Sequence, residues 1–278
     1  RFSIACGVAG SLIPKGTDLS AGRQGGLSAC LAAMMLQSVD YAARALPWMP
    51  DLPWFVALLM VILIMAVFGA INGCVIAFLK VPPFIATLGM QTIVYGLCSV
   101  VTGNDPLGGF KSSYSQVALG SLGRVPYLAI FAILVGLFML FLYNKTRHGK
   151  YMYAIGGNEN AAQVAGVNVP ATLIRIYVLA SVLYAVAGFL VGAKAGGAST
   201  ATGNGYELEA IAACTIGGVS TNGGVGKVGG ILVGVLVFEA LKICLQFLRV
   251  DPAYTFIAQG LVIIVAVALD LRKYLAKK

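Results

Sequence analysis

Long apolar runs alternate with short polar segments along nearly the whole chain, and each run predicts a helix. A helix needs about 20 apolar residues to cross a bilayer. Two of the runs, 26–38 and 207–219, are shorter and flanked by glycine, which favours broken helices facing a protein-lined cavity. We interpret the first run as a truncated span and expect one further span in front of it, which would make ten in the full chain. The predicted spans cover residues 1–14, 26–38, 54–79, 84–102, 124–144, 171–195, 207–219, 228–248 and 252–269.

One polar segment, residues 145–170, interrupts this pattern with bases followed by a short helical stretch. Asn158 is a good N-cap, and Glu159 in the first turn suits the helix dipole. Alanines extend the helix, Gly166 can end it in the left-handed conformation, and Pro170 starts the next span. A helix of about two turns is unstable alone. It must pack either into a groove on a partner or onto its own protein.

Composition agrees with a membrane protein, since 59% of the 278 residues are hydrophobic, 10% are charged and the mean hydropathy is +0.90. Soluble domains carry about 25% charged residues. The 35 glycines suit close packing between transmembrane helices. The predicted fold is therefore all-α, a polytopic helical membrane protein without a separate soluble domain.

The net charge of +9 does not indicate nucleic-acid binding, because the bases lie between apolar runs and form no single stripe. They predict the orientation instead. Placing the clusters near 145–150 and at the C-terminus in the cytoplasm puts twelve bases inside and six outside, as the positive-inside rule requires. Lys242 is then within the membrane. The inside set is Lys15, Arg23, Lys80, Lys145, Arg147, Lys150, Arg175, Lys227, Arg272, Lys273, Lys277 and Lys278.

An internal repeat links two distant segments, Thr17–Leu27 and Thr221–Ile231, which share the pattern T-[D/N]-x-x-x-G-[R/K]-x-G-G-[L/I]. Both precede apolar helices on the predicted inner face. Duplicated halves are frequent in transporters, so the repeat favours a two-half architecture. The second copy resembles a phosphate-binding loop, but that motif needs Gly at 221 and Ser or Thr at 228. The chain has Thr221 and Val228, which argues against ATP binding by this chain.

Several ordered motifs together resemble the permease subunits of bacterial ABC sugar importers of the ribose/galactose class, particularly galactose/methyl-galactoside permeases. The resemblance covers essentially all 278 residues. Two departures are an absent first helix and a segment, Thr102–Gln116, that is shorter than in close relatives and is predicted to be an external loop. The motifs span residues 16–23 (GTDLSAGR), 71–73 (ING), 83–89 (PFIATLG), 154–169 (AIGGNENAAQVAGVNV), 206–214 (YELEAIAAC), 217–226 (GGVSTNGGVG) and 267–270 (VALD).

This resemblance implies a single permease domain with a first half at 1–144, a cytoplasmic coupling loop at 145–170 and a second half at 171–278. The expected partners are a second copy of the permease, a cytoplasmic ABC ATPase, a periplasmic sugar-binding protein and the lipid bilayer of the bacterial inner membrane. ATP and Mg²⁺ would bind to the ATPase, and this chain would bind no cofactor. The implied ATPase-coupling residues are Gly157, Asn158, Glu159, Ala161, Ala162, Ala165 and Gly166.

Polar side chains in apolar spans tend to face a cavity or a helix interface, which gives six candidates for the translocation pathway. Each could instead satisfy a neighbouring polar group. Glu239 and Lys242, one turn apart, are expected to pair with each other. His148 is expected to be a solvated loop residue. The pathway candidates are Asn72, Thr87, Gln91, Tyr95, Glu207 and Glu209.

Other functions remain as alternatives at this point. The same machinery could carry ribose or another pentose, a nucleoside or an autoinducer, because the binding protein largely sets the cargo. An ATP-independent secondary transporter would need intramembrane charges for ion coupling, for which only the Glu239/Lys242 pair is available. No motif resembles a catalytic or metal site, so an enzyme is not expected.

Overall fold

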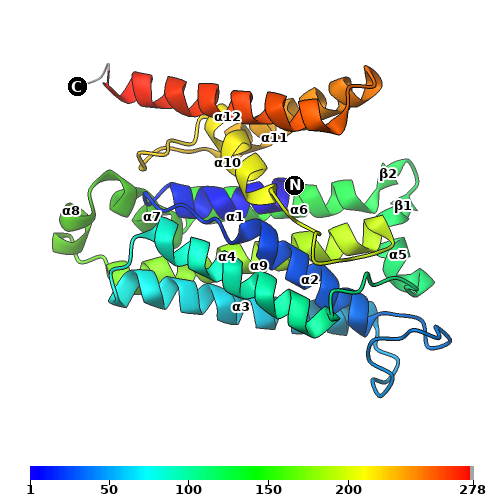
Figure 1. Cartoon of the computed structure of the whole chain (residues 1–278). Coiled ribbons are helices and arrows are strands. Elements are labelled where there is room, and N and C mark those ends of the chain that lie inside the picture. Colours follow the sequence, from blue (N-terminus) through cyan, green and yellow to red (C-terminus); the bar gives the residue numbers. More distant parts are fainter. Residues whose placement is uncertain (276–278) are drawn as a thin grey trace.

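The computed structural model describes residues 1–275, and its regular structure is almost entirely helical (Figure 1). A two-stranded hairpin is the only sheet in these residues. The helices are α1 (Phe2–Leu12), α2 (Ala21–Met35), α3 (Trp54–Phe78), α4 (Pro83–Thr102), α5 (Ser112–Leu119), α6 (Tyr127–Lys145), α7 (Arg147–Gly157), α8 (Glu159–Val164), α9 (Val169–Ala195), α10 (Tyr206–Ile216), α11 (Val228–Phe247) and α12 (Pro252–Leu275), with the strands β1 (Ser121–Leu122) and β2 (Val125–Pro126).

All nine predicted apolar runs form helices, which confirms the polytopic helical fold. Among the described residues, α3, α4, α6, α9 and α11 are long and apolar enough to cross a membrane. The others differ from prediction in detail. Helix α2 begins at Ala21 rather than 26, because Arg23 and Gln24 find hydrogen-bond partners inside the protein. Helix α10 ends at Ile216, three residues before the predicted boundary.

Helix α9 is the central helix, with most of its membrane-length window buried, whereas α3, α4, α6 and α11 are largely exposed. It packs along α3, α2 and α1. Close approach depends on glycines: a Cβ on Gly69 would lie 2.5 Å from the carbonyl oxygen of Tyr177, and one on Gly188 would overlap the backbone of Gly25. Small residues at such crossings provide the van der Waals contact that holds transmembrane helices together.

The two ends of the bundle differ in structure (Figure 1). Helices α7 and α8 lie at one end, hereafter the α8 end. Helix α5 and the hairpin lie at the other. There the predicted loop Thr102–Gln116 contains the start of α5, and Leu107 pairs with Ala198 in an isolated bridge. Two of the predicted inner bases, Lys277 and Lys278, lie outside the described residues.

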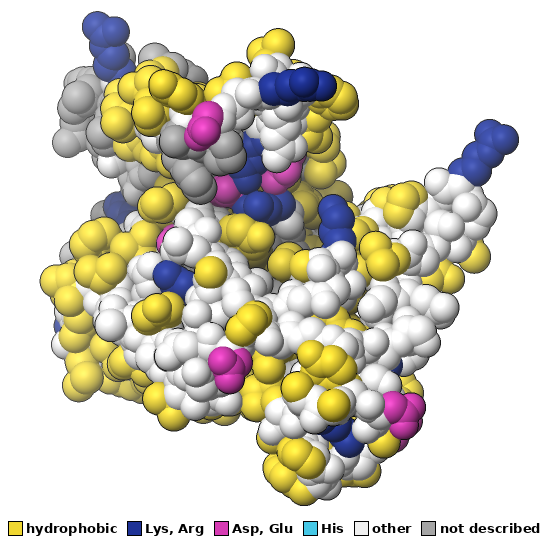
Figure 2. Space-filling view, turned by 45° about the vertical axis from the view of Figure 1, so that its right-hand side comes forward, with side chains coloured by type: hydrophobic (Ala, Val, Ile, Leu, Met, Phe, Trp, Pro, Cys, Tyr) yellow, Lys and Arg dark blue, Asp and Glu magenta, His cyan; other side chains and the backbone are white. Residues whose placement is uncertain are grey.

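The surface is mostly apolar (Figure 2). The exposed large hydrophobic residues lie mainly on the outward faces of α3, α4, α6 and α11. Such extensive apolar exposure is rare on soluble monomers and is expected where lipid is the solvent. Basic and acidic side chains gather in a hollow between the α11–α12 part and the remaining helices (Figure 2).

Candidate translocation and coupling sites

A polar cluster surrounds Arg23 where α2, α4 and the connection to α10 meet; we call it the Arg23 cluster. One guanidinium nitrogen donates to the carbonyl of Thr200 at 2.8 Å, and another donates to Oδ1 of Asn204 at 2.9 Å. The guanidinium carbon lies 4.5 Å from the ring centre of Tyr95. Gln91 Nε2 donates to Oε1 of Glu207 at 3.4 Å. The cluster consists of Arg23, Gln91, Tyr95, Thr200, Asn204 and Glu207.

The local sequence explains why these side chains meet. Gly22 and Gly203 have no side chains, so the connection before α10 lies directly on α2; a Cβ on either would overlap the other's backbone oxygen. Gly205 at φ 79° then starts α10, whose first turn contains Glu207. A carboxylate is favoured there because the helix N-terminus is positive. The second carboxylate oxygen of Glu207 is buried without a hydrogen-bond partner among the described residues.

The depth of the cluster follows from helix geometry. Tyr95 is twelve residues beyond Pro83, at the α8-side start of α4. At about 1.5 Å per residue this places the cluster about 18 Å along the helix, near the middle of a hydrocarbon layer about 30 Å thick. The assignment of Arg23 to the inner face is therefore wrong. Arg23 lies within the bundle, because Thr200 and Asn204 satisfy its donors there.

The structure separates the six pathway candidates. Gln91, Tyr95 and Glu207 meet in the Arg23 cluster. Thr87 is buried and hydrogen-bonds to Thr17 and Leu19, and Asn72 donates to Ser20 at 3.2 Å. Both therefore hold the connection between α1 and α2. One feature of the sequence could have indicated that Arg23 lies inside the bundle: it is a base next to Gly22 at the start of an apolar run. The count of bases on each side of the membrane placed it at the inner face instead.

A second charged cluster contains the remaining candidate, Glu209. It forms ion pairs with Arg1 and with Lys242, the latter at 2.5 Å, while Glu239 pairs with Arg1 at 3.4 Å. The expected pair between Glu239 and Lys242 is wrong, because Lys242 reaches across to α10 rather than along α11.

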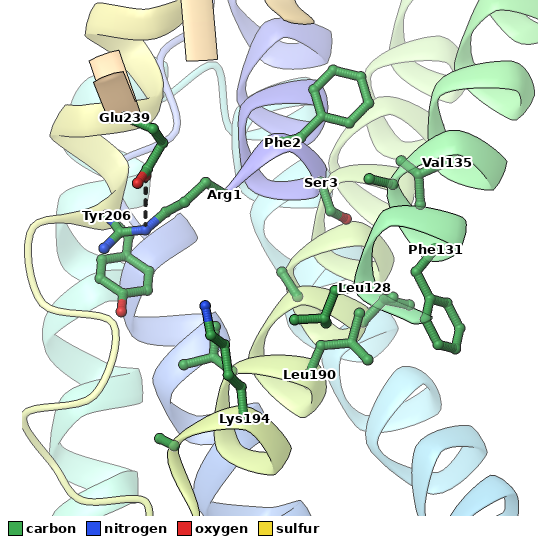
Figure 3. Close-up of a pocket in the computed structure, with 15 residues that line it drawn as sticks. Arg1, Phe2, Ser3, Leu128, Phe131, Val135, Leu190, Lys194, Tyr206 and Glu239 are labelled. Carbon is green, nitrogen blue, oxygen red and sulfur yellow. Dashed lines mark ion pairs between the residues drawn. The ribbon is translucent and has the colours of Figure 1, made fainter. Parts of the chain in front are cut away.

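The second charged cluster borders a cavity of about 510 Å³ (Figure 3). Arg1 extends toward Glu239 over the ring of Tyr206, and its guanidinium carbon lies 3.7 Å from that ring's centre (Figure 3). The opposite wall is apolar and includes Leu128 and Phe131 from α6. Thus one cavity wall is charged and the other is not.

At the α8 end, the predicted helix signals are confirmed. Asn158 caps α8 by accepting from the N–H of Ala161 at 3.0 Å, and Gly166 adopts φ 86°. Tyr151–Ile155 belong to α7, which extends through the glycine pair Gly156–Gly157. Both glycines fit in this helix, because Gly156 packs closely against backbone and Gly157 faces outward.

The coupling candidates lie on two different faces of α8. Ala162 is buried and packs with Ile155, Val167 and Val169, so it seats the helix on its own protein. The other candidates are exposed: Gly157, Asn158, Glu159, Ala161, Ala165 and Gly166. Sequence reasoning missed Val164, whose side chain is 90% exposed. The signal was an isolated branched apolar residue opposite Ala162 on the helix.

His148 differs from the expected solvated residue, since it is half-buried in α7. Burial lowers its pKa below the ordinary 6.5, and the positive charge of Arg175 lowers the pKa further. The imidazole therefore favours the neutral form in the folded protein. Among residues 1–275, no group of three His, Cys, Asp or Glu side chains could hold a metal ion.

The structure is thus a bundle of membrane-length helices with a polar cluster near mid-depth and a short exposed helix at one end, an arrangement that suits a permease. Residues 4–267 match the family described as the branched-chain amino acid transport system permease component, and the chain belongs to this family. It is thus a transport subunit, a multi-pass protein of the bacterial inner membrane.

The similarity to known relatives extends over essentially the whole chain. It is 48% identical to the galactose/methyl galactoside import permease protein MglC of Escherichia coli strain K12, with 100% of this chain and 85% of that protein aligned. Identity is 37% to the ribose import permease protein RbsC of Bacillus subtilis strain 168, over 97% of this chain and 81% of that protein. It is 32% to the D-allose transport system permease protein AlsC of E. coli strain K12, over 94% and 76%. No solved structure matches the chain.

Proposed function

We propose that this chain is the permease subunit of an ATP-driven importer for galactose or a methyl galactoside. The observation that supports this cargo is the 48% identity over the full chain to a galactose/methyl galactoside permease, against 37% and 32% for ribose and allose permeases. The description of the family as a whole names branched-chain amino acid transport and no sugar. The graded identity within it therefore favours galactose or a methyl galactoside over ribose and allose.

The Arg23 cluster is the proposed polar part of the translocation pathway. Sugars are recognised by amide and carboxylate hydrogen bonds and by contact with aromatic faces. Gln91, Asn204 and Glu207 offer the polar groups, and Tyr95, with a side chain 43% exposed, offers the ring. Tyr95 remains partly exposed in this chain, so the side of α4 that carries its ring is incompletely covered. We infer that a second copy of the chain encloses that side.

Helix α8 is the proposed contact for a separate ATPase, with the halves 1–144 and 171–278 on either side of the loop 145–170. Val164 projects from the exposed face of α8, and an apolar side chain exposed on a polar loop fits a groove on a partner. Ala162 contributes by seating the helix. Replacing Ala162 with Trp would therefore disturb coupling by unseating α8, not by blocking the ATPase directly.

Co-purification tests both parts of the proposal. The permease is expressed with candidate ABC ATPases, and ATP hydrolysis by the isolated complex is measured with binding proteins loaded with galactose, ribose or allose. We expect the galactose-loaded protein to stimulate hydrolysis most. Equal stimulation by ribose would sink the cargo assignment and leave the machinery intact.

A matched pair of valines tests the contact. Val164→Asp adds a charge to the exposed face of α8, and Val39→Asp adds the same charge at the opposite end, where Val39 is 55% exposed. Losing a central apolar anchor costs an interface about 2 kcal/mol, so we expect the Val164 variant to retain about thirtyfold less ATPase. Equal retention by both variants would overturn the role of α8.

A further inference from the structure

Three segments distant in sequence meet through their backbones beside α8. They are the end of α7 at Gly156, the connection from α1 to α2 at Ile13, and the connection from α10 to α11 at Gly223–Gly226. The N–H of Gly224 donates to the carbonyl of Ile13 at 2.8 Å. We call this meeting point the glycine junction.

A side chain at Gly156 or Gly223 would not fit in the glycine junction. A Cβ on Gly156 would overlap the carbonyl oxygen of Ile13 and lie 2.5 Å from the nitrogen of Gly224. One on Gly223 would overlap the side chain of Lys15 and lie 2.9 Å from the carbonyl oxygens of both Ile13 and Gly156. Gly223 and Gly224 also adopt φ 83° and 75°, which L side chains rarely tolerate. The contacts of Gly156 with Ile13 and Gly224 are thus contacts between main chains.

Side chains fasten the same three segments. The hydroxyl of Tyr153, on α7, donates to the carbonyl of Gly226 at 2.7 Å. Lys15 Nζ approaches the carbonyl of Gly157 at 3.5 Å. Asp270 on α12 accepts from the backbone N–H of Thr221 at 3.1 Å and also from its hydroxyl and that of Ser220. Helix α12 is therefore fastened to the same connection as α7.

The glycine junction lies between α8 and the Arg23 cluster. From Ile13 the chain runs through Asp18 into α2, which contains Arg23. From Gly223 it runs back through Val219 to α10, which contains Glu207. Backbone packed directly against backbone, as at Gly156, Ile13 and Gly224, transmits displacement with little loss, because protein interiors have low compressibility. Two of the elements that build the Arg23 cluster, α2 and α10, thus share one point of support.

We propose that the glycine junction transmits movement of α8 to α2 and α10 together, with Gly156 and Tyr153 as positioning residues for coupling. This rests on the proposed role of α8 as the ATPase contact. The loop 145–170 is also joined directly to α6 on one side and to α9 on the other, so movement can pass along the chain itself. The glycine junction adds a second route, through contacts. A displacement of α7 would press on both connections at once, and the two sides of the Arg23 cluster would move in the same step.

The test uses three variants of the full permease, each reconstituted with its ATPase and binding protein: Gly156→Ala, Tyr153→Phe and the control Gly229→Ala. Gly229 lies close to Gly226 in sequence, but a Cβ there meets nothing within 4 Å. The readout is sugar transported per ATP hydrolysed, together with ATPase retention. A purely structural role would lower yield or both rates in parallel and leave that ratio unchanged.

We expect Gly156→Ala to lower the ratio by at least about tenfold, since its added methyl must displace two backbones. Tyr153→Phe removes one hydrogen bond and should lower the ratio about fivefold. Gly229→Ala should match the unchanged protein, and ATPase retention should stay the same in all three. Tyr153→Phe adds no atoms, so it decides the matter if Gly156→Ala fails to fold.

Unchanged ratios in both Gly156→Ala and Tyr153→Phe would overturn the proposal. Val164→Asp, measured alongside, separates this failure from that of the proposed function. If Val164→Asp loses the ATPase while the two junction variants stay coupled, α8 is the contact and movement passes only through α6 and α9. If Val164→Asp also keeps the ATPase, the role of α8 itself is wrong.

Discussion

The two copies of the internal repeat have the same spacing but lie in different surroundings. In the first, Thr17–Leu27, helix α2 begins at the fifth position; in the second, Thr221–Ile231, helix α11 begins at the eighth. The penultimate residue is a glycine in both copies, and in both it allows close packing against a backbone carbonyl. A Cβ on Gly26 would overlap the carbonyl of Thr202, just before α10, and one on Gly230 would overlap that of Gly217, just after it.

The comparison teaches which parts of the repeat support the short helix and which have diverged. Equivalent glycines hold the two ends of α10, so the repeat is a packing device for that helix. The polar positions differ. Asp18 is fully buried and accepts from Ser20 and Tyr184, whereas Asn222 is half-buried in the glycine-junction connection. Arg23 is engaged at mid-depth, while Lys227 is exposed.

The largest expected effect comes from the second position of each copy. Asp18→Ala leaves the Ser20 and Tyr184 donors buried without an acceptor and should lower the free energy of unfolding by about 3 kcal/mol. Asn222→Ala should lower it by less than about 1 kcal/mol. Thermal midpoints of the purified permease in detergent measure the difference. Equal shifts would mean that the two copies are energetically equivalent there.

The tenth position should show the opposite behaviour, with equal effects in the two copies. Gly26→Ala and Gly230→Ala each force a methyl into a backbone, and each should lower the free energy of unfolding by about 2 kcal/mol. Gly229→Ala, in open space within α11, should be neutral or slightly stabilising because alanine favours a helix. If one glycine variant melts like Gly229→Ala, the repeat supports only one end of α10.

The seventh position separates transport from folding. Arg23→Ala removes two hydrogen bonds and the ring contact with Tyr95, and it should lower sugar uptake about tenfold. Lys227→Ala should change uptake less than about twofold, as for exposed surface residues. Arg23→Lys keeps the charge without the planar fork and should restore uptake only in part. Initial uptake rates, normalised to permease content, provide the measurement.

The smallest expected effect concerns pH at α7, which contacts the second copy through Tyr153. Because the pKa of His148 is lowered in the folded protein, the unfolded chain binds its proton first as the pH falls through 6.5. The free energy of unfolding therefore decreases as the pH decreases through that range. His148→Gln should flatten this part of the pH dependence of the thermal midpoint. Parallel curves for the two proteins would show that His148 titrates alike in both states.

Much of the fold was predictable, because apolar run length alone specifies membrane helices and nine of nine runs became helices. The cap at Asn158 and the left-handed Gly166 were equally readable, since both are local signals. Local signals also predicted that α8 is a short helix and that one of its faces must pack against something. They could not say which face would be buried.

The rest depended on tertiary contacts. Lys242 is one turn from Glu239, yet it pairs with Glu209 on another helix. Arg23 reads as a base at a membrane surface until the partners Thr200 and Asn204, about 180 residues away in the chain, are known. Ala162 and Ala161 are neighbours of identical chemistry, and only the packing of α8 assigns one inward and the other outward.

The most direct test is sugar uptake into proteoliposomes that contain the permease, the ATPase that co-purifies with it and a galactose-loaded binding protein. We expect galactose to accumulate only with ATP, at least about tenfold faster than ribose under matched conditions, as a site discriminating by hydrogen bonds allows. Val164→Asp should lower this uptake about thirtyfold, in line with its loss of ATPase, and Val39→Asp should preserve it. Accumulation that is independent of ATP, or equal for the two valine variants, would contradict an ATP-driven permease coupled through α8.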